Sequence, residues 1–216
     1  MTGPTKCDVF SRAAENRRLF ADTVDGLDAS AYEAQTLCAG WTVHVLTAHM
    51  VQPMQVGFAR FFLTAIRHRG DTDATVDSIA RRIARRPVVE LTAVLRDRAD
   101  VALSPPRVGP LGPFSDTCLH LRDLARPLGL DADVSLDDWR TCLDYFAGPN
   151  AADALVPRGR LTGLRLRATD QDWSSGTGPE VTGTSEALAM AMSGRAAALV
   201  DLDGSGVDTL AERIAS

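Results

Sequence analysis

Apolar side chains recur at helical spacing near the start of the chain, and this pattern predicts an amphipathic first helix. The stripe lies between Thr5 and Leu27 and comprises Val9, Ala13, Phe20, Val24 and Leu27. Arginine and glutamate residues separate its members, so one face of the helix is apolar and the other is polar. We therefore expect a long helix that buries its apolar face.

A second helix is indicated by a capping residue that precedes an apolar run. Thr42 is a favourable N-cap, and the run that follows it includes His49. Pro53 should kink this helix, because proline lacks the N–H that an interior helical position donates. The Arg-rich residues 67–70 suit its C-terminal end, where basic side chains interact favourably with the helix dipole.

A third helix and a long loop are predicted next. Pro87 fits a first helical position, and the helix that follows it should end before Ser104. Residues 104–113 read Ser-Pro-Pro-Arg-Val-Gly-Pro-Leu-Gly-Pro. Because this stretch is so rich in proline and glycine, we expect a loop without regular structure.

Two further helices complete the helical part of the chain. The pattern predicts one from near Ser115 to Arg126 that stops at Pro127 and Gly129. Ser135, with an aspartate three residues on, resembles a capping box and opens another helix that runs through Phe146.

The pattern changes from helical to alternating after Gly148. Between Leu164 and Ala168, apolar residues alternate with arginines in the period of two that is typical of a half-buried strand. Residues 170–183 contain a Ser-Ser-Gly-Thr-Gly-Pro turn and indicate a hairpin or a second strand. Thr184 is expected to cap a helix, and residues 207–214 should form a short final one.

Together these elements predict an α+β protein with two domains. We expect a helical bundle over residues 1–148 and a small α/β domain over residues 158–216, joined by a linker that bears glycine and proline. The chain has 216 residues, of which 45% are hydrophobic and 24% charged, so it has ample material for a buried core.

Charge and apolar content exclude several classes of partner. The net charge of −5 argues against a nucleic-acid-binding surface and against a polybasic membrane surface, because both need clustered positive potential. We see no apolar segment of signal-peptide or membrane-span length, and we expect a cytoplasmic protein. The cysteines are Cys7, Cys38, Cys118 and Cys142, without any CxxC pair, so reduced thiols are expected.

The candidate functional residues are polar side chains that interrupt the apolar pattern of the predicted helices. His49 is one such residue, and Asp116, His120 and Asp123 form a group on a later helix. On a helix, Asp116 lies about 40° from His120 and about 20° from Asp123, so the three share one face. A carboxylate and an imidazole four residues apart can bind one metal ion, and a histidine of a facing helix can supply a third ligand. Such a site keeps an open position for a reactant.

Structural roles can also explain these residues. His49 could be a core histidine with satisfied hydrogen bonds, Asp116 could favour the first turn of a helix, and Asp123 could pair with Arg126. His44 is excluded from a site with His49, since the two are about 140° apart on a helix.

Other polar features carry no site of their own. We assign His68 to a polar helix end, and Cys38 and Trp41 to packing. The turn at residues 176–178 lacks the lysine and the helix start of a phosphate loop.

Two motifs and the C-terminal segment resemble a known family. Residues 36–49, Thr-Leu-Cys-Ala-Gly-Trp-Thr-Val-His-Val-Leu-Thr-Ala-His, resemble the motif that opens the metal-binding domain of the mycothiol-dependent maleylpyruvate isomerase family, a branch of the DinB-like bundles. The family's second motif, Glu-x-x-x-His followed by an aspartate and Pro-Leu-Gly, is similar to residues 116–129. Residues 168–173, 178–181 and 193–195 resemble its small C-terminal domain.

The resemblance implies a DinB-like four-helix bundle with a metal ion, zinc or another divalent ion, bound by His49, Asp116 and His120. The sulfur of mycothiol, a low-molecular-weight thiol, would take the open position, where a divalent cation stabilises thiolate over thiol. Asp123 would orient His120 or another ligand. Arg195 is implied as the group that binds a substrate carboxylate, although a surface arginine after a helix end is an equal alternative.

The implied reaction is cis–trans isomerisation of a maleylpyruvate-like acid through addition and elimination of the thiolate. Transfer of the thiol to an electrophile is the alternative reaction, and a metal-binding or ligand-binding module without turnover is the non-enzymatic one. One departure from the family bears on all three: Asp116 stands where the family has glutamate and is one methylene shorter. The sequence names neither the substrate nor the oligomeric state.

Overall fold

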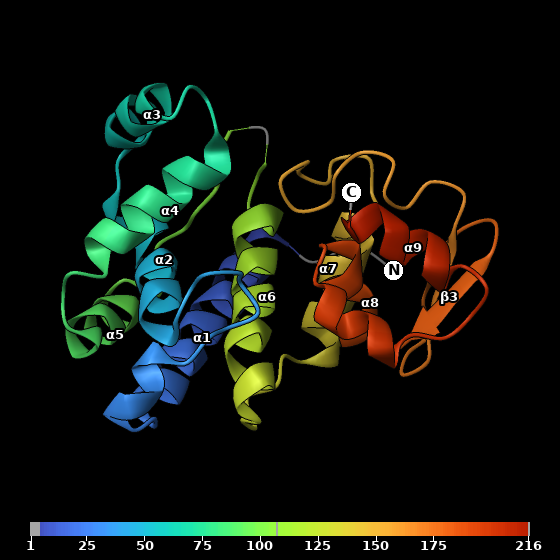
Figure 1. Ribbon diagram of the computed structural model, residues 1–216, viewed down its shortest axis with the longest axis horizontal. Helices are drawn as coiled ribbons and strands as arrows, with labels where there is room; N and C mark the ends of the chain where they lie inside the picture. Colours follow the sequence, from blue (N-terminus) through green and yellow to red (C-terminus); the bar gives the residue numbers. More distant parts are fainter. Residues whose placement is uncertain (1–4, 107, 216) are drawn as a thin grey trace. The chain divides into compact units, whose positions relative to one another are not determined.

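The computed structural model describes residues 5–106 and 108–215, which form two compact units (Figure 1). The bundle unit comprises Thr5–Leu103 and residues 120–133, and the C-terminal unit comprises the other described residues, 104–106, 108–119 and 134–215. The division falls inside one helix, α6 (Leu111–Leu128). Met1 and Ser216, at the outer ends of the predicted domains, and Arg107 of the predicted loop lie outside the described residues.

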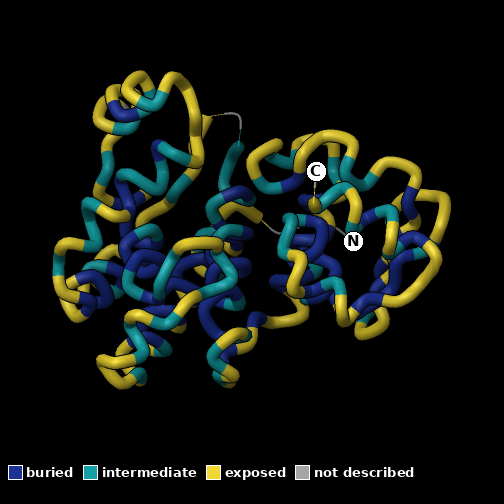
Figure 2. Tube along the Cα trace, viewed as in Figure 1, coloured by how far each residue is buried: buried dark blue, intermediate teal, exposed yellow. Residues whose placement is uncertain are grey.

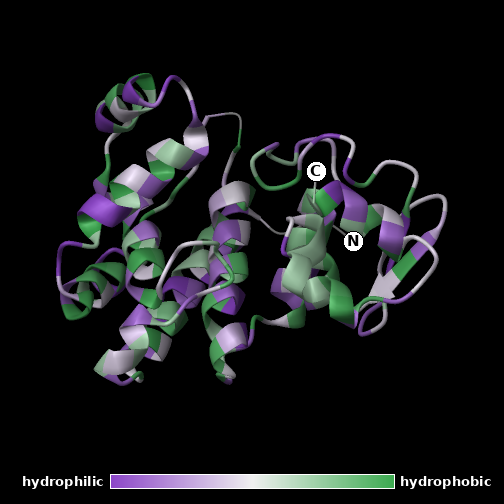
Figure 3. Ribbon diagram, in the orientation of Figure 1, coloured by the Kyte–Doolittle hydropathy of each residue, from purple (hydrophilic) through white to green (hydrophobic). Residues whose placement is uncertain are grey.

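The bundle unit is helical throughout. Its elements, besides the second half of α6, are α1 (Lys6–Asp25), the 3-10 helix η1 (Ala29–Glu33), α2 (Val43–Gln55), α3 (Phe58–Arg67), α4 (Thr72–Ile83) and α5 (Val88–Asp97). Helix α2 packs against α4 and α5, and α1 packs against α5 (Figure 1). Phe20, Leu46 and Leu91 are fully buried, and each such side chain contributes about 1.5–3 kcal/mol to folding. Apolar, buried segments concentrate in α1, α2 and α5, whereas α3 is mostly exposed (Figures 2 and 3).

Side-chain caps explain where three of these helices begin. Thr5 forms a capping box with Asp8 ahead of α1, and the Thr42 side chain accepts a hydrogen bond from Val45 N–H ahead of α2. Asp71 caps α4 in the same way. Each cap satisfies an N–H that has no acceptor within the helix. The predicted starts of α1 and α2 are confirmed.

The predicted kinked helix from residue 42 to 70 is wrong. Helix α2 ends at Gln55, and Val56 and Gly57 are extended before α3 begins at Phe58. Pro53 lies inside the last turn of α2. Because its missing N–H weakens that turn, the chain separates into two helices instead of bending one.

Helix α4 was not foreseen, and Pro87 has a different position from the expected one. Residues 72–83 form α4 behind the Asp71 cap. Pro87 is the N-cap of α5 and precedes the first helical residue instead of occupying it.

Helix α6 is longer than predicted at both ends. It begins at Leu111, inside the predicted loop, and runs through Pro127 to Leu128. Pro113 is the third helical residue, where an N–H has no intrahelical acceptor, so proline costs little. Near the other end, the missing N–H of Pro127 leaves the carbonyl of Asp123 to accept a hydrogen bond from Leu37 N–H, at 3.0 Å.

The C-terminal unit combines helices with a three-stranded sheet. Its elements, besides the first half of α6, are α7 (Leu136–Phe146), β1 (Arg165–Ala168), β2 (Ser174–Gly176), β3 (Glu180–Gly183), α8 (Ser185–Met192), the 3-10 helix η2 (Ala196–Asp201) and α9 (Val207–Ala215). The strand order is β2-β1-β3; β1 pairs antiparallel with β2 and parallel with β3. Leu166 and Ala168 are buried in β1, and Thr184 caps α8, as predicted.

The architecture confirms the predicted α+β class, with a helical bundle followed by a small unit that carries the sheet. In that unit α7 packs against α8, and Trp173 Nε1 donates to Asp144 Oδ1 of α7 at 2.8 Å. The contacts thus group α7 with the C-terminal elements, and the domain boundary at residue 148 stays a prediction. Among the described helices, none is both long and apolar enough to span a membrane.

Candidate functional site

Two histidines from helices distant in sequence meet in the bundle unit. His49 lies on α2 and His120 on α6. Their ring centroids are 4.8 Å apart, with the rings nearly perpendicular at 80°. His120 is 6% exposed, and His49 is half-buried. Two imidazoles at this distance can direct one nitrogen each to the same ion.

Asp116 adds a carboxylate to this pair. It precedes His120 by one turn of the same continuous helix, so helical geometry sets the spacing between them. The potential ligand atoms of His49, Asp116 and His120 all lie within 4.8 Å of one another. Two imidazoles and one carboxylate are a donor set that catalytic zinc sites use, with the fourth position open. The residues present therefore fit a divalent metal ion.

A buried carboxylate orients His120. Its Nδ1 lies 2.9 Å from Oδ2 of Asp123, a residue with no exposed surface. A contact this short between an imidazole nitrogen and a carboxylate requires a proton on the nitrogen, because a carboxylate only accepts. The proton on Nδ1 leaves the lone pair on Nε2, the arrangement that metal-binding histidines show.

Cys38 reaches the same carboxylate, so its assignment to packing is incomplete. Its thiol donates to Asp123 Oδ2 at 3.2 Å, and its Sγ lies 3.6 Å from His120 Nδ1. Cys38, His120 and Asp123 also form a second group whose donor atoms could hold a metal ion. No sequence pattern indicates this, since 82 residues separate Cys38 from His120.

A tightly hydrogen-bonded loop holds Cys38 in place. Thr36 Oγ1 accepts from Cys38 N–H at 3.2 Å and donates to the carbonyl of Trp41 at 2.9 Å. Trp41 N–H donates back to the carbonyl of Cys38, which closes a turn with Gly40 at a φ of 74°. Glycine suits this backbone because other residues rarely adopt a positive φ.

Trp41 is more than a packing residue as well. Its ring centroid lies 4.9 Å from that of His49 and 6.5 Å from that of His120. Its Nε1 donates to Asp77 Oδ1 of α4 at 2.8 Å. Burial raises the pKa of Asp77, but hydrogen bonds from Arg81 and Trp41 outweigh it and bring the pKa below its ordinary value. The unforeseen α4 thus anchors an indole against the histidine pair.

The remaining histidines serve other contacts. His44 Nε2 lies 2.8 Å from the carbonyl of Arg86. His68 is the C-cap of α3, as the prediction of a polar helix end requires.

Arg195 lies in the C-terminal unit, after α8 and directly before η2. Its Nη1 donates to the carbonyl of Ser193 at 3.2 Å, and Nη1 of Arg160 approaches the carbonyl of Met192 at 3.4 Å. Burial and then the positive charge of Arg195 lower the pKa of Arg160. Two half-buried guanidinium groups therefore gather at the C-terminal end of α8, where helix carbonyls favour positive charge.

With this geometry established, the chain was compared with known families. The family model described as the mycothiol maleylpyruvate isomerase N-terminal domain matches residues 13–173. The chain belongs to this family. The matched segment includes His49, Asp116, His120 and Asp123 and ends before Arg195. No curated protein matches the chain.

Solved structures of similar fold lead to the same family. A crystal structure of the mycothiol-dependent maleylpyruvate isomerase has a TM-score of 0.66 at 14% sequence identity, with 95% of this chain and 96% of that chain covered. A crystal structure of a histidine-to-alanine mutant of mycothiol-dependent maleylpyruvate isomerase has a TM-score of 0.56 at the same identity and coverage. At this identity the two structures establish the fold, and they confirm the predicted α+β class, a DinB-like helical bundle with a small sheet in the C-terminal part.

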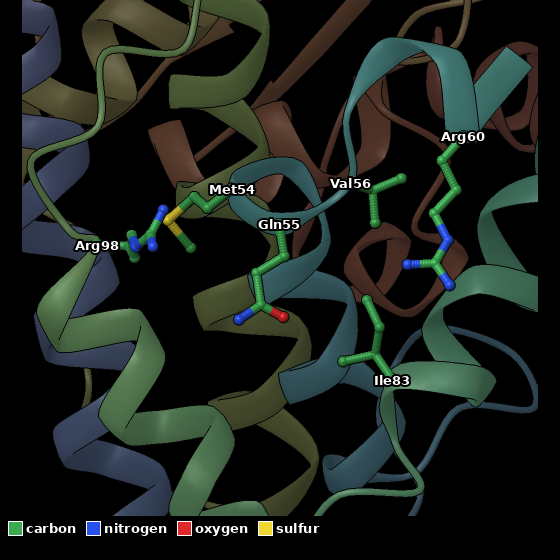
Figure 4. A pocket seen from close by; sticks show the side chains of 6 residues that line it. All are labelled: Met54, Gln55, Val56, Arg60, Ile83 and Arg98. Carbon is green, nitrogen blue, oxygen red and sulfur yellow. The ribbon is translucent and has the colours of Figure 1, made fainter.

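A pocket of about 350 Å³ lies at the C-terminal end of α2 and contains none of the predicted ligands (Figure 4). Its lining residues are Met54, Gln55, Val56, Arg60, Ile83 and Arg98. Apolar side chains of α2 and α4 lie between the two arginines (Figure 4). Since none of these lining residues is a predicted ligand, we assign the pocket no part in the site.

Proposed function

We propose that this protein is a metal-dependent enzyme that uses mycothiol and isomerises a maleylpyruvate-like acid. The observation that carries the proposal is the convergence of His49, Asp116 and His120 within one ion's reach in a chain of the mycothiol maleylpyruvate isomerase family. Zinc is the metal we favour, because two imidazoles and a carboxylate suit it. A cellular thiol as co-substrate agrees with the cytoplasmic location, which stays a prediction.

The three side chains would hold the ion, and each has a defined task. His49 and His120 would each direct one ring nitrogen to it, and Asp123 would keep the proton of His120 on Nδ1. Asp116 would supply the negative charge. When bound, the ion lowers the pKa of a thiol, so that the nucleophilic thiolate is present at neutral pH.

The proposed reaction regenerates the thiolate in each catalytic cycle. The sulfur adds to one carbon of the conjugated cis double bond, and the electron pair of that bond moves onto the adjoining carbonyl. The remaining single bond rotates. Expulsion of the thiolate then restores the double bond in the trans form, so mycothiol is not consumed.

The pair Arg160 and Arg195 supports an anionic substrate. Burial first, and the positive charge of Arg195 second, lower the pKa of Arg160, and a bound carboxylate would offset both effects. Guanidinium groups also suit carboxylates geometrically, because two N–H groups can donate in parallel. We assign the substrate carboxylate to Arg195.

Metal analysis of the purified protein tests the first half of the proposal. We expect about one zinc per chain, bound tightly enough to survive gel filtration, and a loss of activity with a chelator that zinc restores. A folded wild-type protein that binds no divalent ion would contradict the metal-dependent function.

Incubation with mycothiol and maleylpyruvate, followed by chromatography and mass spectrometry, tests the second half. The proposal predicts a trans isomer of unchanged mass and mycothiol at its starting concentration. A stable product whose mass includes mycothiol would favour S-transfer instead. A metal-loaded protein that converts neither maleylpyruvate nor generic electrophiles would be a binding module.

A further inference from the structure

Asp123 is joined twice to the loop at residues 36–41. Its side-chain Oδ2 accepts the thiol proton of Cys38 at 3.2 Å, and its carbonyl accepts the N–H of Leu37 at 3.0 Å. Two adjacent loop residues thus bind one residue of α6, one through its side chain and the other through its backbone.

The backbone contact depends on Pro127. In a regular helix the carbonyl of Asp123 would accept the N–H of the residue four positions later. That residue is Pro127, which has no N–H, so the carbonyl is available to Leu37. The proline in the last turn of α6 thus provides the attachment point for the loop.

The side-chain contact acts directly on His120. Cys38 S–H and His120 Nδ1–H donate to the same carboxylate oxygen. The second donor keeps that oxygen directed toward the imidazole. Asp123 has no exposed surface, so water does not compete for this contact.

The loop also continues into the helix that carries the other histidine. Val43 N–H donates to the carbonyl of Ala34, and Thr42 caps α2 directly after the loop. Trp41 within the loop contacts the ring of His49. The loop is therefore bonded to α6 at Asp123 and leads covalently into α2.

We propose that Cys38, Leu37 and Pro127 form a clasp on Asp123 that positions the ring of His120 for metal binding. Cys38 is a positioning residue in this arrangement, and its thiol acts as a hydrogen-bond donor. The inference rests on the proposed function in its reference to a metal, and it adds three residues that act through Asp123.

The same atoms could instead bind an ion themselves, but the distances favour the clasp. Tetrahedral zinc with bonds of about 2.0–2.2 Å separates a nitrogen and an oxygen ligand by roughly 3.4 Å. His120 Nδ1 and Asp123 Oδ2 are 2.9 Å apart, a hydrogen-bond distance. The proton between them occupies the lone pair that an ion would need.

Nitrogen-detected NMR of the full-length, metal-free protein tests the clasp without reference to zinc. In the wild type, at a pH where the imidazole is neutral, we expect His120 entirely as the tautomer protonated at Nδ1. Cys38→Ala and Pro127→Ala should each populate the other tautomer or broaden the signal. Cys38→Ser keeps a donor and should restore the wild-type spectrum, and Cys7→Ser, at an exposed cysteine, is the matched control.

Zinc affinity, measured by competition with a chromophoric chelator, is the second readout. Loss of an outer partner of a metal-binding histidine weakens binding about 10- to 100-fold. Cys38 acts on His120 through Asp123, one hydrogen bond further from the metal. We therefore expect zinc affinity to fall about tenfold in Cys38→Ala and to change little in Cys38→Ser and Cys7→Ser.

Two results would overturn the clasp. One is a Cys38→Ala protein whose His120 tautomer and zinc affinity both equal those of the wild type. The other is a sulfur-to-cobalt charge-transfer band in the Co²⁺-loaded protein that Cys38→Ser removes, since Cys38 would then be a ligand. A wild type that binds no zinc would contradict the proposed function, while the tautomer measurement would still decide the clasp.

Discussion

The histidine pair of the bundle unit and the arginine pair of the C-terminal unit have opposite electrostatic surroundings. Around His120, a buried carboxylate, a thiol and an indole are arranged so that the imidazole keeps its lone pair on Nε2. Around Arg195, a second guanidinium raises the local positive charge, and the backbone carbonyls of Met192 and Ser193 at the C-terminal end of α8 bind the two groups.

The difference shows that each region suits a ligand of one sign. Imidazole nitrogens beside a carboxylate favour a cation, whereas paired guanidinium groups favour an anion. The enzyme that we propose, which depends on a metal and acts on an organic acid, would use both. Substitutions in the histidine pair should therefore change metal binding, and substitutions in the arginine pair should change substrate binding.

The largest expected effect is the loss of metal on removing a ligand. His120→Ala should weaken zinc binding by more than about 100-fold, since losing a ligand should exceed the loss of an outer partner. Chelator competition measures it, and Arg195→Gln should leave zinc binding unchanged. If His120→Ala binds zinc as well as the wild type, the histidine pair is not the metal site.

Removing a guanidinium should act on the substrate instead. Arg195→Gln and Arg160→Gln should each raise KM about 10- to 100-fold, because a hydrogen bond to a charged group contributes about 1.5–3 kcal/mol. Arg158→Gln is the control, since Arg158 lies in the same segment, is exposed and pairs with Asp153. Steady-state kinetics would contradict the assignment if all three variants behaved alike.

A smaller effect is expected from lengthening the carboxylate ligand. Asp116→Glu introduces the residue that the family motif normally has and should raise zinc affinity by no more than about tenfold, because it improves reach without adding a donor. Asp116→Asn removes the charge and should lower affinity. Affinities measured by competition at constant pH decide this, and equal values for all three proteins would mean that Asp116 does not contact the metal.

The smallest effect concerns the support of Trp41. Because the folded pKa of Asp77 is lowered, its stabilising contribution is present above the unfolded value of about 3.9 and is lost as the pH falls through the folded pKa. Asp77→Asn should therefore lower Tm at pH 7 by an amount equivalent to about 1 kcal/mol or less, and the difference should shrink below pH ~3.9. Thermal melts at the two pH values measure it; a difference that grows in acid would contradict this sign.

Several features of the fold were predictable because they depend on neighbours in sequence. Thr42 and Thr184 cap helices through N–H groups three residues ahead, and residues 165–168 alternate in burial as a half-buried strand does. Two of the errors fell at prolines. Pro53 lies in the last turn of α2 and Pro127 in the last turn of α6, where Leu37 N–H binds the carbonyl of Asp123 that the proline leaves without its helical donor.

The candidate site also has features that the sequence predicts and features that it does not. The spacing of Asp116 and His120 on one helical face follows from the sequence alone, because a helix turns by a constant angle per residue. The family motifs identified His49 as their partner. Nothing local indicated that Cys38 would reach Asp123 across 85 residues, or that α4 would hold Trp41 through Asp77.

By itself, then, the amino-acid sequence determined the caps, the helical faces and the type of ligands, since these are properties of short segments and of side-chain chemistry. Only the tertiary structure decided the contacts that neither spacing nor the family motifs indicate: the thiol of Cys38 with Asp123, Trp41 with Asp77, and Arg160 with Arg195. The physical reason is that contacts between distant residues form through packing of whole elements, and the energy of that packing is spread over many buried side chains.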